Sequence, residues 1–136
     1  DLRAGDSVLL ARLPHTSEVP VAVALLGLMV AGIRVVLPMT VDSSIGRLVD
    51  ATGCRVIVRS GVREEAGPLA ELMERVAAER DLPTECVNAV LTAPVGDPPT
   101  GLPTDREVLV LTTSGTTGEA KGVRYTERAL LAGLEA

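Results

Sequence analysis

The sequence predicts an α/β fold in which helices flank a largely parallel sheet. Short apolar runs alternate with helix-length segments along most of the 136 residues. The apolar runs are continuous, as expected for strands whose two faces are both covered by helices. Regular alternation of strands and helices is typical of parallel sheets.

The composition supports one aliphatic core. Hydrophobic residues make up 46% of the chain, and Tyr125 is its one aromatic residue. So high an apolar fraction argues against a disordered chain, and Ala, Val and Leu have to fill the core. The length suits one domain or a large part of one.

The first half of the chain begins with a strand and a helix. Residues 7–13 form an apolar run, and residues 18–31 follow as a helix that Thr16 or Ser17 caps. This helix is apolar on nearly all sides, so we expect it to be buried. A glycine ends the helix, and residues 33–37 form the next strand.

A second and a third helix alternate with another strand. Asp42 or Ser43 caps the second helix, which reaches about Ala51 and also ends at a glycine. Residues 54–58 form the strand. Residues 67–80 form an amphipathic helix, because their apolar side chains recur at helical spacing.

The last third contains the remaining predicted elements. Residues 86–91 and 107–112 read as strands, and residues 92–105 between them carry four prolines and two glycines, which predicts a loop. Residues 123–125 are extended, and Thr126 caps a last helix.

The most informative stretch follows the 107–112 strand. Residues 114–122 read Ser-Gly-Thr-Thr-Gly-Glu-Ala-Lys-Gly. The glycines allow backbone N–H groups to approach a ligand closely, the hydroxyls add donors, and Lys121 adds a positive charge. Successive N–H groups in such a turn form an anion-binding concavity. The stretch therefore predicts a phosphate or oxyanion site.

Two common nucleotide-binding signatures do not fit this stretch. A Walker motif needs four residues between its glycines and a Ser or Thr after its lysine. Here two residues separate Gly115 from Gly118, and Gly122 follows Lys121. The dinucleotide fingerprint starts with Gly-x-Gly, which is also missing.

A third signature does fit. Residues 111–123, which read Leu-Thr-Thr-Ser-Gly-Thr-Thr-Gly-Glu-Ala-Lys-Gly-Val, closely resemble the phosphate loop of the adenylate-forming superfamily. That superfamily includes acyl-CoA synthetases, peptide-synthetase adenylation domains and luciferase-type enzymes. Residues 28–38 and 45–58 resemble the helices and strands that precede its loop, so the resemblance covers nearly the whole chain.

The resemblance implies an activity. Enzymes of this superfamily convert ATP and a carboxylic acid into an acyl-adenylate and pyrophosphate, and a thiol of CoA or of a carrier protein then accepts the acyl group. The loop would hold the ATP phosphates through Thr113, Ser114, Gly115, Thr116, Thr117, Gly118 and Lys121.

The resemblance also implies a division of the protein. Residues 1–136 would be part of the large N-terminal adenylation domain and would end just after the phosphate loop. The Mg²⁺ ligand, the ribose-binding Asp and the catalytic Lys of the family are expected outside this chain. We therefore expect the chain to need the remainder of the enzyme and to be inactive alone.

Four positions depart from the family pattern. An aromatic is frequent where Thr112 stands, Pro is usual at Ala120, His is common at Glu127, and Asn is common at His15. Two other interpretations stay open. The chain is either a non-catalytic adenylation-like module that scaffolds or binds a partner, or an unrelated phosphate-binding α/β domain.

Several partners and sites are not expected. The net charge is −5 and there is no basic block, which argues against nucleic acid. The most apolar stretch, residues 19–33, is shorter than the ~20 residues of a membrane span and no signal-peptide pattern precedes it. Cys54 and Cys86 lack metal-ligand spacing, so we expect no metal among these residues and reduced, buried thiols in a cytoplasmic protein.

Overall fold

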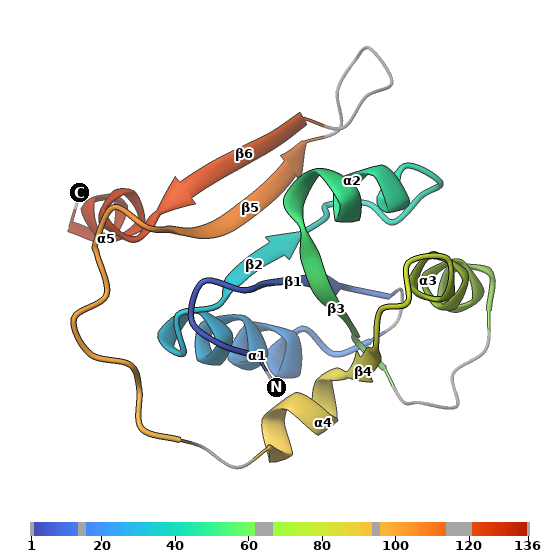
Figure 1. Cartoon of the computed structure of the whole chain (residues 1–136), viewed down its shortest axis with the longest axis horizontal. Helices are drawn as coiled ribbons and strands as arrows, with labels where there is room; N and C mark the ends of the chain where they lie inside the picture. The colour runs from blue at the N-terminus through green and yellow to red at the C-terminus, as the bar shows by residue number, and fades with distance from the viewer. Residues whose placement is uncertain (1, 14–15, 62–66, 94–95, 114–120, 136) are drawn as a thin grey trace.

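The computed structural model describes residues 2–13, 16–61, 67–93, 96–113 and 121–135 (Figure 1). They form a six-stranded sheet in the order β4-β3-β1-β2-β5-β6. The strands are β1 (Ser7–Ala11), β2 (Arg34–Leu37), β3 (Cys54–Arg59), β4 (Thr84–Cys86), β5 (Glu107–Thr113) and β6 (Lys121–Thr126). The helices are α1 (Glu18–Val30), α2 (Ile45–Thr52), α3 (Pro68–Ala78), α4 (Val87–Thr92) and α5 (Glu127–Glu135).

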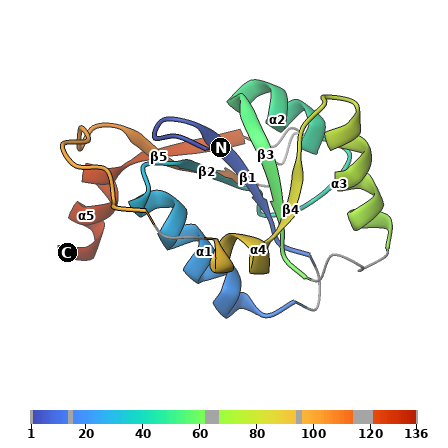
Figure 2. The same ribbon diagram turned by 60° about the horizontal axis from the view of Figure 1, so that its bottom comes forward.

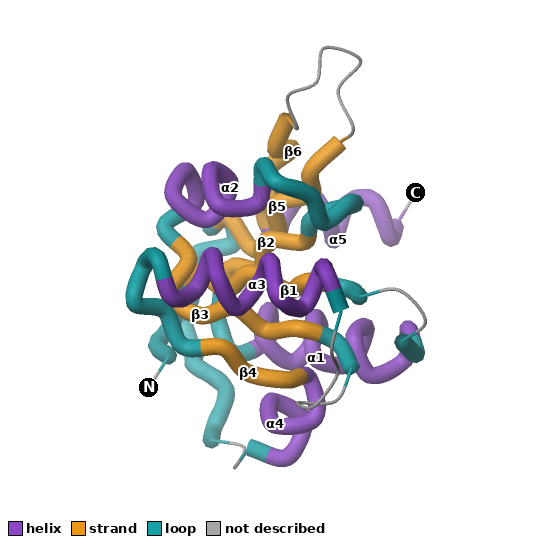
Figure 3. Tube along the Cα trace, turned by 90° about the vertical axis from the view of Figure 1, so that its right-hand side faces the viewer, coloured by secondary structure: helices purple, strands orange, loops and turns teal. Residues whose placement is uncertain are grey.

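The sheet is parallel from β4 through β5, and β6 pairs antiparallel with β5. Figure 3 shows the strands stacked in this order, with the β5–β6 hairpin at one side of the sheet and β4 at the other. The predicted α/β class with a largely parallel sheet is confirmed.

Helices cover both faces of the sheet and produce two apolar clusters. Helices α1 and α4 pack on one face, and α2 and α3 pack on the other (Figure 2). Strand β1 lies between them with no accessible surface at Val8, Leu9, Leu10 and Ala11. Burial on both faces explains why this run is continuously apolar rather than alternating.

Most predicted elements are confirmed. Gly32 and Gly53 follow α1 and α2 with φ of +80° and +61°, a conformation that glycine adopts without a steric penalty. At the start of α5, the Ala129 N–H donates to Thr126 Oγ1 at 3.2 Å, so the predicted cap is present.

The predicted caps of α1 and α2 differ in detail. Ser17 occupies the N-cap of α1 but makes no side-chain capping bond, and the Thr16 hydroxyl donates to the carbonyl of Leu13 instead. The N-cap of α2 is Ser44, whose N–H donates to Asp42 Oδ1 at 2.8 Å.

The predicted strand at 86–91 is wrong. Strand β4 ends at Cys86, and Val87–Thr92 form the short helix α4. A short apolar run does not distinguish a helix from a strand by periodicity alone. Val87 and Val90, one turn apart, belong to the apolar cluster beneath α1, and this tertiary packing decides the helix.

The expectation that the first helix is buried all round is also wrong. Val21, Ala24 and Leu28 face the sheet, whereas Val19, Val23, Leu26 and Val30 are between 52% and 70% exposed. The apolar composition of α1 correctly predicts that this helix packs on the core. It does not reveal that the other face of the helix is exposed in the described part of the chain.

Charged side chains join several strands at their amino ends. Arg34, the first residue of β2, donates to Ser7 Oγ at 2.8 Å, to Glu107 Oε2 at 2.8 Å and to the Thr52 carbonyl at 2.5 Å. Glu107, the first residue of β5, also accepts a bond from Arg124 of β6 at 3.0 Å. The cluster thus links β1, β2, β5, β6 and the end of α2.

We predict that Glu107 contributes a pH-dependent part of the stability. The hydrogen bond from Arg124, followed by that from Arg34, lowers the pKa of Glu107 below its ordinary 4.5. A depressed folded-state pKa stabilises the fold above pH 4.5, and this contribution is lost as the pH falls through the folded pKa. In urea unfolding between pH 7 and acid, Glu107→Gln should lose less stability than the wild type, and Glu71→Gln should behave like the wild type. Equal losses in all three proteins would contradict this role.

We also predict opposite behaviour for two leucines of α1. Leu28 is 7% exposed and Leu26 is 61% exposed. Leu28→Ala should lower the free energy of unfolding by about 2–5 kcal/mol because it opens a cavity in the core. Leu26→Ala should change it by less than about 0.5 kcal/mol. Urea unfolding of both variants tests which face of α1 carries the core.

Candidate functional site

The predicted phosphate loop connects two paired strands at the carboxyl edge of the sheet. Ligands of open α/β sheets bind at this edge. Thr113 is the last residue of β5, Lys121 is the first residue of β6, and the two are directly paired. Lys121 is exposed. Of the predicted site residues, Thr113 and Lys121 thus lie opposite each other, and Ser114, Gly115, Thr116, Thr117 and Gly118 lie outside the described residues.

Thr112 connects this pair of strands to the loop after β2. Its side chain is 3% exposed, and its Oγ1 accepts the N–H of Met39 at 3.1 Å. The sequence singled Thr112 out only as a departure from the family pattern. A stronger signal was available, since a hydroxyl at the end of an apolar strand is expected to need a partner once it is buried.

A second buried hydroxyl connects the loops that follow β1 and β3. Ser60 is 2% exposed, and its Oγ accepts the N–H of Leu13 at 2.7 Å. Its Oγ also lies 2.7 Å from Thr16 Oγ1. The sequence analysis missed this contact, because it joins residues that are 47 positions apart.

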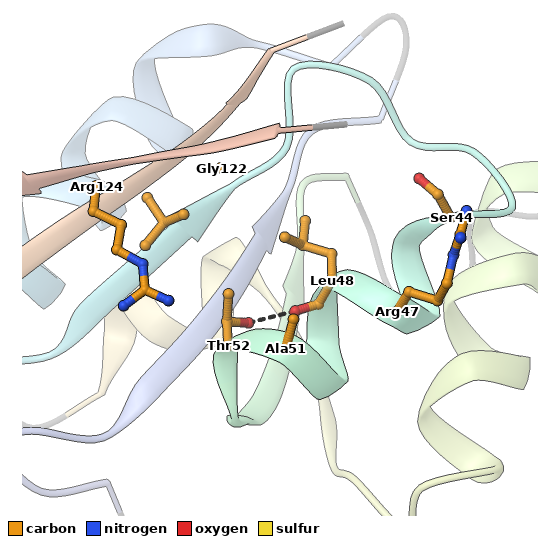
Figure 4. Close-up of a pocket in the computed structure, with 8 residues that line it drawn as sticks. Ser44, Arg47, Leu48, Ala51, Thr52, Gly122 and Arg124 are labelled. Carbon is orange, nitrogen blue, oxygen red and sulfur yellow. Dashed lines mark hydrogen bonds between the residues drawn. The ribbon is translucent and has the colours of Figure 1, made fainter. Parts of the chain in front are cut away.

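A groove of about 300 Å³ separates α2 from the β5–β6 hairpin (Figure 4). Arg124 lies at one end, Ser44 and Arg47 lie at the other, and Leu48 is between them. The groove is also lined by Ala51, Thr52, Val110 and Gly122. A Cβ at Gly122 would stand 3.2 Å from Val110 Cγ1, so the glycine leaves this side of the hairpin open. Gly122, which lines the groove, directly follows Lys121 in β6.

The structure gives Glu127 a role in holding α5. Glu127 Oε2 accepts a bond from Arg106 Nε at 3.1 Å, and the Glu127 N–H donates to the Arg106 carbonyl at 3.2 Å. The Arg106 side chain is 18% exposed, so the pair is largely shielded from solvent. The departure from the family's histidine therefore has a structural partner in this chain. His15 and Ala120, two further departures from the family pattern, lie outside the described residues.

Three further expectations from the sequence concern the cysteines, metal binding and membrane-spanning helices. Cys54 is buried, Cys86 is half-buried, and both are free thiols. Burial raises the pKa of the Cys54 thiol, which keeps it protonated. Among the described ranges, no three His, Cys, Asp or Glu side chains are grouped as metal ligands. In the same ranges, no helix has the length and apolar character to cross a membrane.

Comparison with known proteins was informative only for structure. No protein-family model matches the chain, and no curated protein matches it in sequence. Solved structures do match. Apo MatB from Rhodopseudomonas palustris aligns with 97% of the chain at 17% identity and a TM-score of 0.74. McyG A-PCP, complexed with phenylalanyl-adenylate, aligns with 96% at 21% identity and a TM-score of 0.70.

A third matching structure contains a nucleotide. The o-succinylbenzoate CoA synthetase MenE from Bacillus subtilis, in complex with ATP and a magnesium ion, aligns with 92% of the chain at 20% identity and a TM-score of 0.65. The chain has the fold of the adenylate-forming enzymes. The resemblance inferred from residues 111–123 is therefore confirmed at the level of the fold. The chain spans 26% of MatB, 21% of McyG A-PCP and 31% of MenE.

Proposed function

We propose that the chain is part of an ATP-dependent acyl-activating enzyme, an AMP-forming ligase that converts a carboxylic acid into an acyl-adenylate with release of pyrophosphate. A thiol of CoA or of a carrier protein then accepts the acyl group. The observation that carries the proposal is Lys121 at the loop end of the β5–β6 hairpin, opposite Thr113, on the fold of enzymes solved with adenylates. Residues 113–118 supply the rest of the phosphate contacts.

The proposed reaction requires groups that stabilise negative charge on the phosphates of ATP. The carboxylate attacks the α-phosphorus of ATP, and the bond from that phosphorus to the oxygen of the β-phosphate breaks. Pyrophosphate is the leaving group, so negative charge collects on the β- and γ-phosphates. Lys121 is the one lysine among 13 basic residues of the chain. Its ammonium is a compact charge on a flexible stem, suited to phosphate oxygens. Backbone N–H groups and hydroxyls of the loop donate to the same oxygens, and such donors act most strongly in the transition state.

Magnesium fits the proposal as a partner of the phosphates. A Mg²⁺ ion bridges phosphate oxygens and takes one or two carboxylates. By its resemblance to the adenylate-forming superfamily, we place the protein ligand of Mg²⁺ outside this chain, in the remainder of the enzyme. Residues 1–136 form a partial N-terminal adenylation domain in this proposal and are inactive alone.

A second candidate function is a non-catalytic adenylation-like module. The pairing of Glu127 with Arg106 favours it, because a histidine is common at this position in the superfamily that the sequence resembles, and the residue here forms an ion pair. Calorimetry of the complete protein distinguishes the two. An enzyme should give a saturable heat with ATP or pyrophosphate, and a scaffold should give none.

We predict that ATP–pyrophosphate exchange by the complete enzyme depends on Lys121. Exchange should require a carboxylic acid, and Lys121→Ala should lower its rate by about 10²–10³-fold, the effect of removing one oxyanion donor. Gly115→Val should also lower it. Arg128→Ala is the matched control, because it removes a cation from the exposed side of α5. Exchange that survives Lys121→Ala would exclude the role proposed for the loop.

A further inference from the structure

The position of Lys121 is coupled to that of strand β5. Strand β6 is the edge of the sheet, and its first four residues are exposed. Strand β5 is therefore the one strand that pairs with it among the described residues. Any displacement of the end of β5 moves Lys121 with it, because Thr113 and Lys121 form the last pair of this ladder.

The end of β5 extends past its other neighbour. The ladder between β2 and β5 runs from Val35–Leu109 to Leu37–Leu111, and β2 stops there. Thr112 and Thr113 therefore have no strand partner on the β2 side. At this point the Thr112 hydroxyl accepts the Met39 N–H at 3.1 Å. The Thr112 side chain thus connects β5 to the loop after β2, just beyond the last backbone pair of the β2–β5 ladder.

We propose that Thr112 is a positioning residue for Lys121. Its buried hydroxyl holds the end of β5 against the loop after β2, and the β5–β6 ladder transmits this position to the lysine. The inference rests on the proposed function only in taking the Lys121 ammonium as a phosphate ligand. The hydrogen bond itself is independent of that function.

Ser60 provides a matched control. Its hydroxyl is 2% exposed, accepts a backbone N–H at 2.7 Å and lies at the same edge of the sheet. It joins the loops after β1 and β3, neither of which pairs with the hairpin. Ser60→Ala and Thr112→Val therefore each remove one buried acceptor from a backbone N–H, but only Thr112→Val releases the strand that carries Lys121.

The test combines three measurements on the complete enzyme. Hydrogen exchange of the peptide containing Met39 should accelerate in Thr112→Val and should stay slow in Thr112→Ser, which keeps the acceptor. Thermal unfolding should shift downward in both Thr112→Val and Ser60→Ala, and at least as far in the latter, because the Ser60 hydroxyl also bonds Thr16 Oγ1. Calorimetric affinity for pyrophosphate should fall by about 2–10-fold, the effect of one hydrogen bond, in Thr112→Val alone.

The outcomes separate this inference from the proposed function. Equal pyrophosphate affinities in wild type and Thr112→Val, or an equal loss in Ser60→Ala, overturn the positioning role while exchange activity still supports the function. A wild-type enzyme that does not bind pyrophosphate overturns the proposed function and the positioning role together. Restored affinity in Thr112→Ser supports the inference, because a general loss of stability would not be rescued by the hydroxyl.

Discussion

The placement of β5 beside β2 is the constraint on which the rest of the structure depends. The chain leaves β4 at one edge of the sheet and returns to pair at the opposite side of β2, so two strands distant in sequence become neighbours. This pairing brings the carboxyl end of β5 next to the loop after β2, and it leaves β6 as an edge strand. Without it, Lys121 would have no fixed relation to the rest of the carboxyl edge.

The two ends of β5 are held by different kinds of interaction. At its amino end, Glu107 pairs with Arg34 and Arg124 in a cluster that is a quarter to more than half exposed, so salt and acid weaken it. At its carboxyl end, Thr112 makes a neutral, buried hydrogen bond. This bond contains no titratable group. Acid therefore weakens the ion pairs that hold the amino end of β5, whereas it does not act directly on the Thr112 hydrogen bond at the carboxyl end.

The sequence predicts the local elements well and the contacts between them poorly. Continuous apolar runs and helix-ending glycines are local signals, and they located every strand of the sheet except β4. The residues after β4 form a helix instead, because they pack against α1. The hydroxyls of Ser60 and Thr112 bond residues 47 and 73 positions away. Periodicity does not reveal such pairs, because they depend on which strands become neighbours. The motif therefore predicts a site, but it does not indicate the residues that we propose to position it.

The arginines and the one lysine of the chain differ in the partners that their head groups suit. Arginine makes the ion pairs described above, and its planar fork suits them. Arg34 donates hydrogen bonds to three groups, and Arg80 donates to both carboxylate oxygens of Asp50 at 2.7 and 2.8 Å. The one lysine stands at the start of β6, beside the loop. A flexible ammonium can follow a phosphate group whose charge and position change during reaction, whereas a rigid fork holds a fixed partner. In the proposed function, a lysine at the start of β6 therefore suits an anionic ligand whose position changes during the reaction.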